Sequence, residues 1–390
     1  MKNNSVLKIL PVLFGFFVMG FCDIVGISSD YAKDAFGWSN TMAGFIPSMV
    51  FVWFLFLGIP VGTLMNKYGR KNMVLISMAI TVFGMFLPLL SYNSVNCMLA
   101  YAFLGIGNAI LQVSLNPLLS NVITNQEMLT SSLTAGQVVK AISSLVGPYI
   151  VLLGINWLGD GTTQSWYYCF PILGGITILS GVWLMCTNIQ REKVEAEQKN
   201  VLKDTLSLLK DKTILLLFLG IFFVVGVDVA TNFISSKLMI ARFDWAKEEA
   251  GLATQVYFLS RTVGAFIGVF VMTRMSELKY FRMNILACIV ALVLLAVVSQ
   301  QGVDLVCIGG VGFFCSCIFS IIYSMAVQAR PDKANLISGL MITAVAGGGA
   351  VTPVIGVVTD GVGIVGGVCV IMLCVVYLTY CAFGIKTKRV

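Results

Sequence analysis

Long apolar runs alternate with short polar or charged segments along the whole chain. Cutting the hydropathy pattern at these segments gives twelve runs, each long enough, or nearly so, to cross a ~30 Å hydrocarbon core as a helix. The pattern therefore predicts an all-α integral membrane protein with twelve transmembrane helices. The predicted spans are 7–29, 41–65, 72–91, 97–120, 129–154, 166–187, 213–235, 249–273, 283–299, 303–328, 335–358 and 363–385.

Composition supports this reading. Of 390 residues, 58% are hydrophobic and only 11% are charged, whereas about a quarter are charged in a soluble protein. The first run is too long for a signal peptide and lacks a small-residue cleavage site, so we expect a first spanning helix. The eleven cysteines lie almost all inside apolar runs, without CxxC, and the chain has no His. We expect no metal site, no disulfide framework and no cofactor.

Lys and Arg concentrate in alternate loops, which predicts cytoplasmic N- and C-termini by the positive-inside rule. The opposite loops hold only Lys33, Lys237, Arg242 and Lys247. The expected aromatic belt at that outer boundary consists of Trp38, Trp157, Trp166 and Trp245. The net charge of +7 is thus explained by topology, and we expect no nucleic-acid partner. We expect a monomer in the cell membrane, a bacterial inner membrane.

The longest hydrophilic stretch divides the chain into two sets of six spans. We predict an N-terminal six-helix lobe (1–187), a cytoplasmic linker (188–212) and a C-terminal six-helix lobe (213–390). Sliding the second half back by about 205 residues places VMGFCDIVG (18–26) on FVVGVDVAT (223–231), and so Asp23 on Asp228. A parallel repeat of six spans is typical of two-lobed secondary transporters.

The segment GTLMNKYGRK (62–71) resembles the signature loop that follows the second helix in the major facilitator superfamily. Asn66 stands where that signature has an Asp, so the charge of that acid is absent. We expect the glycine that opens the motif to allow close helix approach, and the cations to face helix C-termini and phosphates. The matching residues are Gly62, Lys67, Gly69, Arg70 and Lys71.

Within that superfamily the chain is most similar to the fucose and glucose/galactose proton-symporter group. Asp23 fits the acid of that group's first helix, SLNPLL (114–119) its Asn-Pro, and Gln137 a Gln in helix five. GGAVTPVIGVVTD (348–360) resembles its helix eleven. Where fucose-type members carry a Glu in helix four, this chain has Gln112, so a proton site there is absent. The resemblance implies proton-coupled sugar uptake.

Four ionisable residues lie deep inside the spans: Asp23, Lys140, Asp228 and Arg261. Each costs ~2.5–3.5 kcal/mol at a helix centre, so we expect them to pair. One interpretation is a set of static bridges between helices. The other is that the bridges break and reform as substrate or protons bind, with Asp23 and Asp228 as proton-coupling residues and Lys140 and Arg261 as charge partners. Lys140 is the expected partner of Asp23.

Amide and aromatic side chains within the spans are the candidate substrate ligands. Amides both donate and accept hydrogen bonds, which suits vicinal hydroxyls, and aromatic rings can stack on a sugar face. Ordinary helix packing is the alternative for each of them. The candidates are Gln112, Asn116, Gln137, Asn232, Trp53 and Tyr257, with Phe233 as a further ring.

These observations predict a secondary active transporter for a sugar or sugar derivative, coupled to protons and working by alternating access. A carrier of organic anions or acidic sugars, clasped by Lys140 and Arg261, is an alternative, as are facilitative transport and efflux. Without a GKS/T loop, ATP is not the direct energy source. An enzyme would need a nucleophile–base pair or metal ligands, and the chain has no His and no GxSxG. A channel would need a continuous lined pore. We therefore expect a transporter and no enzyme.

Overall fold

The computed structural model describes residues 2–24, 28, 31–32, 35–38, 40–123, 128–191, 201–245 and 247–385, and within them all regular structure is helical. Within the described residues, the predicted spans fall on helices. In the first half these are α1 (Lys2–Met19) with the 3₁₀ segment η1 (Gly20–Ile24), α3 (Asn40–Tyr68), α4 (Arg70–Leu90), α5 (Ser94–Val122), α6 (Leu129–Leu153) with the π-helical turn η3 (Gly154–Leu158), and η4 (Thr163–Tyr168) with α7 (Cys169–Cys186).

The second half begins with short helices and then continues as six further spans. They are α8 (Val201–Ser207), η5 (Leu208–Lys210), α9 (Lys212–Phe243), α10 (Lys247–Val271), α11 (Glu277–Val297), α12 (Gln301–Cys315) with α13 (Ile318–Ala329), η6 (Pro331–Lys333), α14 (Ala334–Thr343), η7 (Ala344–Ala346), α15 (Gly347–Val362) and α16 (Ile364–Gly384). Helix α11 begins six residues before the predicted span 283–299, because the charged residues around its first turn hide its start from a hydropathy cut.

Among the described residues, ten helices are long and apolar enough to cross a membrane, or eleven if a pair bent by 44°, Leu129–Gly147 and Tyr149–Leu158, is one span. The predicted span 7–29 falls on α1 and η1, and its residues 25–27 and 29 lie outside the described part. So do linker residues 192–200, Lys33 and residues 386–390. The fold is that of an all-α, multi-pass membrane protein.

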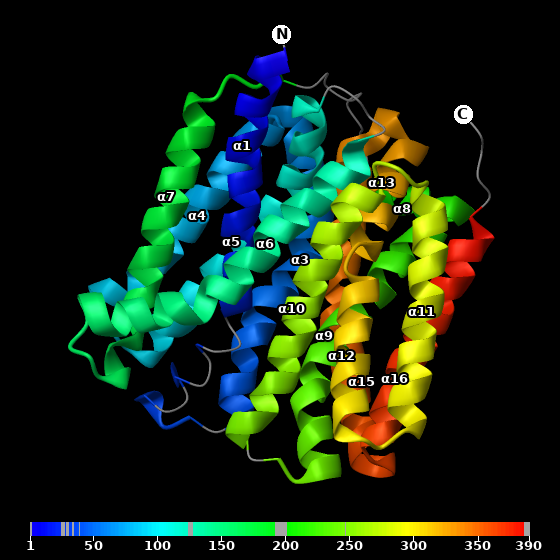
Figure 1. Cartoon of the computed structure of the whole chain (residues 1–390). Helices are drawn as coiled ribbons and strands as arrows, with labels where there is room; N and C mark the ends of the chain where they lie inside the picture. Colours follow the sequence, from blue (N-terminus) through cyan, green and yellow to red (C-terminus); the bar gives the residue numbers. More distant parts are fainter. Residues whose placement is uncertain are drawn as a thin grey trace. The chain divides into compact units, whose positions relative to one another are not determined.

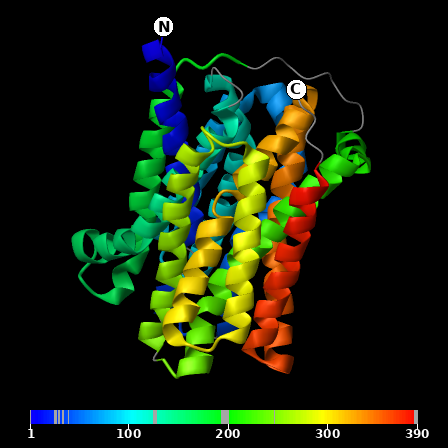
Figure 2. The same ribbon diagram turned by 45° about the vertical axis from the view of Figure 1, so that its right-hand side comes forward.

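Two compact units make up the chain. Unit 1 contains Met1–Leu129, Val139–Thr205 and Asp332–Thr343, and unit 2 contains Thr130–Val138, Leu206–Pro331 and Ala344–Val390. In unit 1, α5 packs against α4, α3 and α1, and α7 lies along α4 (Figure 1). In unit 2, α9 packs against α15 and α16, and α10 against α12 (Figure 2).

The composition of the units follows the internal repeat. Thr130–Val138, from the fifth predicted span, belongs to unit 2, and Asp332–Thr343, from the eleventh, belongs to unit 1. Shifted by about 205 places, residues 130–138 fall on residues 335–343. Equivalent pieces of the two halves are therefore assigned to opposite units, and the assignment changes within each of these two spans.

Small residues bring α14 against α3 in unit 1. A Cβ atom on Gly339 would lie 2.4 Å from the carbonyl oxygen of Gly58, and one on Gly62 would lie 2.7 Å from that of Asn335. Ser338 also donates a 2.6 Å hydrogen bond to the carbonyl of Val113 on α5. Glycines at four-residue spacing let two helix backbones touch. The interface therefore depends on the absence of side chains.

Candidate functional site

Asp23 lies where the first span changes from α-helix to 3₁₀-helix. Helix α1 ends at Met19, and Asp23 belongs to the 3₁₀ segment η1. On α6, the hydroxyl of Ser144 donates to Asp23 Oδ2 across 2.5 Å. Cys22 Sγ lies 3.4 Å from the other carboxylate oxygen, Oδ1. The carboxylate is half-buried, so it is held by neighbours without being sealed from solvent.

Lys140 meets η1 through its backbone. A Cβ atom on Gly20 would lie 2.6 Å from the carbonyl oxygen of Lys140 and 2.7 Å from Ser143 Cβ. The same Lys140 carbonyl lies 3.1 Å from the hydroxyl of Ser144, which can donate to it. The close contact at Gly20 thus brings Ser144 to Asp23. From α6, the hydroxyl of Ser144 contacts the Asp23 carboxylate, and the pairing of Asp23 with the Lys140 ammonium stays a prediction.

Three amides follow one face of α5 at four-residue spacing. Gln112 Nε2 donates to Asn108 Oδ1 at 2.8 Å, and Asn108 Nδ2 donates to the carbonyl of Met19 at 2.8 Å. Asn116 Nδ2 donates to the carbonyl of Gln112 at 2.9 Å. Their exposed fractions are 2%, 6% and 1% for Asn108, Gln112 and Asn116. The amide groups of Gln112 and Asn116 are therefore engaged inside unit 1, although Asn116 Oδ1 has no partner among the described residues.

In unit 2, Asp228 on α9 forms an ion pair with Arg261 on α10. The sequence alone leaves undecided which of the four charges pair. Arg261 Nη2 lies 3.0 Å from Asp228 Oδ2, and the two side chains are 25% and 26% exposed. Tyr257, one turn before Arg261, donates its hydroxyl to Asp228 Oδ1. Pairing offsets part of the desolvation of both charges, while their partial exposure leaves the pair accessible to a polar ligand.

Two of the aromatic candidates, Trp53 and Tyr257, pack against glycines of neighbouring helices. Tyr257 is fully buried, and its backbone oxygen lies 2.7 Å from the place of a Cβ on Gly312 of α12. A Cβ on Gly105 would lie 2.7 Å from Trp53 Cδ1, and the Trp53 indole nitrogen has no partner among the described residues. With its ring buried, Tyr257 contacts the ion pair of unit 2 through its hydroxyl.

The remaining polar candidates lie in unit 2, on α9 and on the part of α6 that belongs to that unit. Asn232 is half-buried on α9, one turn after Asp228, and Gln137 is half-buried on α6. Further along α9, Phe233 is exposed, and Lys237 Nζ lies 3.3 Å from its ring centroid. Asp228 and Asn232 thus share one face of α9.

The signature loop ties α4 to α5 and α14 within unit 1. Arg70 is buried; its Nε donates to Asn335 Oδ1 at 2.8 Å, and its Nη1 donates to the carbonyl of Pro117 at 3.0 Å and to Asn121 Oδ1 at 2.6 Å. Asn335 Nδ2 in turn donates to Asn66 Oδ1 at 2.7 Å. Asn66 therefore takes part in the cluster through a bond between two neutral amides.

The other cations of the loop region lie at helix ends, as expected from the helix dipole. Lys71 Nζ donates to the carbonyls of Met185 at 3.0 Å and Thr187 at 2.8 Å, where α7 ends. Arg191 donates to the carbonyl of Lys67 at the end of α3. Gly69, between α3 and α4, has φ of 85°, a conformation that strains residues with a side chain.

Sequence reasoning missed five residues of these clusters: Asn108, Ser144, Asn335, Thr130 and Glu277. Thr130 donates its hydroxyl to Glu277 at the start of α11 in unit 2. At the repeat offset, Thr130 corresponds to Asn335. The spacing of Asn108 four residues before Gln112 was a usable signal, because residues at i and i+4 are neighbours on a helix.

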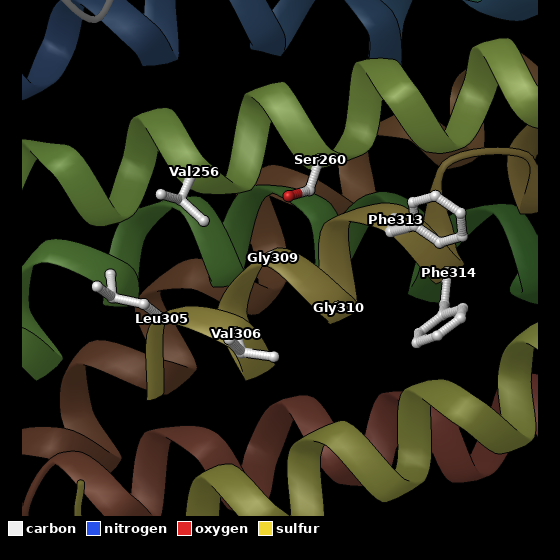
Figure 3. A pocket seen from close by; sticks show the side chains of 8 residues that line it. All are labelled: Val256, Ser260, Leu305, Val306, Gly309, Gly310, Phe313 and Phe314. Carbon is white, nitrogen blue, oxygen red and sulfur yellow. The ribbon is translucent and has the colours of Figure 1, made fainter. Parts of the chain in front are cut away.

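A groove of about 460 Å³ runs between α10 and α12 in unit 2 (Figure 3). Its lining carries one hydroxyl, that of Ser260, and no charged side chain. Such a surface lacks the convergent polar groups of a site for a polar ligand, so the groove is not our candidate site. The lining residues are Val256, Ser260, Leu305, Val306, Gly309, Gly310, Phe313 and Phe314.

Comparison with known proteins gives relatives over nearly the whole length. A glucose/galactose transporter of Brucella abortus is 23% identical over 396 residues, which covers 97% of this chain and 94% of the relative. A Helicobacter pylori protein with a provisional glucose/galactose transporter name is 26% identical over 377 residues, covering 92% and 90%.

Among solved structures, the transporter FucP in its outward conformation matches with a TM-score of 0.83 and 18% identity, over 98% of this chain and 100% of that chain. FucP is the fucose:proton symporter of E. coli. At this identity the match shows a shared fold. The family model of the Major Facilitator Superfamily matches residues 12–353. With most of its length covered by that model, the chain belongs to the Major Facilitator Superfamily of transporters.

Proposed function

We propose that the protein lies in a bacterial inner membrane with both chain termini in the cytoplasm. There it takes up a neutral sugar together with protons by alternating access. The observation that carries this proposal is the half-buried Asp23 carboxylate, held by a hydroxyl at a helix break inside a membrane span. An intramembrane carboxylate is costly unless it has a function or a partner. The names of the relatives, glucose/galactose transporter and fucose:proton symporter, support sugar and proton as the transported species.

The hydrogen bond between Ser144 and Asp23 depends on whether the Asp23 carboxyl is protonated. When the carboxylate is charged, the Ser144 hydroxyl donates to it across 2.5 Å. When the carboxyl is protonated it becomes a donor itself, and the Ser144 hydroxyl is free to donate to the carbonyl of Lys140, 3.1 Å away. Proton binding thus rearranges the contact between η1 and α6.

The charge balance in unit 2 favours a neutral substrate over an acidic one. Arg261 is already neutralised by Asp228 at 3.0 Å, so a substrate carboxylate would have to displace that acid. A sugar hydroxyl can instead join the pair as donor to Asp228 or acceptor from Arg261. Asn232, on the same face of α9, supplies an amide of the kind that suits vicinal hydroxyls.

Alternating access also needs an interface that opens, and we assign this role to the contact of α14 with α3 and α5 in unit 1. It joins residues from both halves of the chain, and it consists of glycine contacts and hydrogen bonds between uncharged groups, together with Arg70. Such an interface separates without leaving a buried carboxylate behind.

Uptake by purified protein in proteoliposomes tests the proposal. Radiolabelled D-galactose and D-glucose are offered with an inside-alkaline pH gradient, with and without a protonophore, and D-glucuronate is the acidic comparison. We expect saturable accumulation of a neutral hexose that collapses with the protonophore. Equilibration without accumulation would contradict proton coupling, and accumulation of D-glucuronate alone would establish the acidic-sugar alternative.

A further inference from the structure

We propose that Asn108 is a positioning residue for Asp23, and that Gln112 orients Asn108 for this task. The inference rests on the proposed role of Asp23 in proton coupling. It assigns no contact between Asn108 and the substrate. It concerns the helix break that presents the carboxylate, and it gives the buried amide of Gln112 a function of its own.

The first step is the carbonyl at the break. The change from α1 to η1 replaces i→i−4 hydrogen bonds by i→i−3 bonds, so the carbonyl at the junction loses its regular geometry. That carbonyl belongs to Met19. It accepts the 2.8 Å bond from Asn108 Nδ2 and lies 3.3 Å from Cys22 Sγ. An amide from α5 thus satisfies the backbone group that the break exposes.

The second step is the orientation of that amide. Gln112 Nε2 donates to Asn108 Oδ1 at 2.8 Å, which leaves the Asn108 NH₂ group directed at Met19. A charged carboxylate at position 112 has no hydrogen to donate. It would instead attract the NH₂ group and turn the Asn108 oxygen towards the Met19 carbonyl, placing two acceptors face to face. Both amides are almost completely buried, so water cannot readily replace the lost bonds.

The third step connects the break to the carboxylate. Gly20, directly after Met19, is pressed against the α6 backbone at Lys140 and Ser143, and Ser144 then reaches Asp23. Segment η1 is therefore fixed between an amide of α5 on one side and the backbone and hydroxyl of α6 on the other. Loss of the Asn108 bond frees the α5 side and lets Asp23 move away from Ser144.

The first experiment compares Asn108→Ala with Ser114→Ala in the full-length protein. Ser114 is a matched control because it is buried on the same helix and its hydroxyl bonds to the carbonyl of Ile110, within that helix. The readout needs no substrate: an infrared pH titration of the carboxyl band that disappears in Asp23→Asn. We expect Asn108→Ala to displace the titration midpoint by about one pH unit, and Ser114→Ala to leave it in place. Equal midpoints in both variants would overturn the proposal.

The second experiment uses Gln112→Glu. A protonated Glu has an O–H that can donate to Asn108 as Gln does, whereas a charged Glu cannot. We expect the Asp23 midpoint of this variant to move from the wild-type value towards that of Asn108→Ala, because a charged Glu at position 112 no longer orients Asn108. An Asp23 band that follows the wild type throughout would overturn the orienting role of Gln112. If Asn108→Ala fails to fold, Asn108→Asp, which keeps the side-chain size, replaces it.

Transport then separates this inference from the proposed function. With D-galactose or D-glucose as the probe, Asn108→Ala should keep counterflow while accumulation driven by a pH gradient falls about tenfold. If neither hexose is transported but the infrared midpoint moves, the sugar function fails and the positioning role stands. If proton-driven uptake is intact in Asn108→Ala and the midpoint is unmoved, the positioning role fails and the function stands.

Discussion

Gly339→Ala is the sharpest perturbation of the α3–α14 interface. The new Cβ would lie 2.4 Å from the Gly58 carbonyl oxygen and 3.2 Å from Gly62 Cα, and ordinary contact begins at 3.4 Å. Because both neighbours are backbone, α14 must retreat by about 1 Å. Overpacking of this kind costs about 1–3 kcal/mol, which corresponds to a roughly 5- to 150-fold loss in the population of the closed interface.

A cysteine at position 338 reports on that population. Ser338 is fully buried and bonds to Val113, so Ser338→Cys should react with a membrane-impermeant maleimide only when α14 leaves α5. The exposed Cys186 and Cys369 are first replaced by Ser. We expect Gly339→Ala to raise the labelling rate at least about fivefold. Gly349→Ala is the control, since no described atom lies within 4 Å of its Cβ position. Equal rates in the two variants would refute the close-contact argument.

Three further predictions concern topology and the charged residues. Cysteine labelling should find Lys203→Cys in the linker accessible only from the cytoplasm and Lys237→Cys only from outside; outside labelling of the linker contradicts the twelve-span topology. Lys140→Gln should impair coupling or stability in uptake and thermal-unfolding measurements whatever the substrate; loss of acidic-sugar uptake alone, with neutral uptake spared, would instead show that Lys140 holds a carboxylate. Arg261→Gln should lower the free energy of unfolding by about 1–3 kcal/mol, because it leaves Asp228 without its cation. Adding Asp228→Asn should restore part of that loss, and strictly additive effects would argue against an energetically significant pair.

Hydropathy predicts the spans because a bilayer core of about 30 Å demands long apolar helices, and within the described residues the predicted spans fall on helices, some of them interrupted. The sequence pattern does not predict that the fifth and eleventh spans are each divided between the two compact units. Thr130–Val138 and Asp332–Thr343 are assigned by packing, and packing of small residues such as Gly58 and Gly339 leaves no hydropathy signal.

The charged part of the site could be predicted because charges are rare and costly inside a membrane. Asp228 and Arg261 were candidates on that ground alone, and they do pair. Neutral groups carry no comparable signal, since their meaning depends on what they face. Ser144 and Asn108 are ordinary polar residues in the sequence, and only the geometry shows that they touch Asp23 and the Met19 carbonyl.

The most direct test of the central claim, that Asp23 couples transport to protons, compares two assays on Asp23→Asn. This variant imitates a permanently protonated carboxyl, so it should still bind hexose and exchange it in counterflow, while accumulation driven by an imposed pH gradient is lost. Asp228→Asn, measured beside it, should show a weaker coupling defect. Accumulation by Asp23→Asn as steep as that of the wild type would contradict the account and leave Asp23 with a structural role.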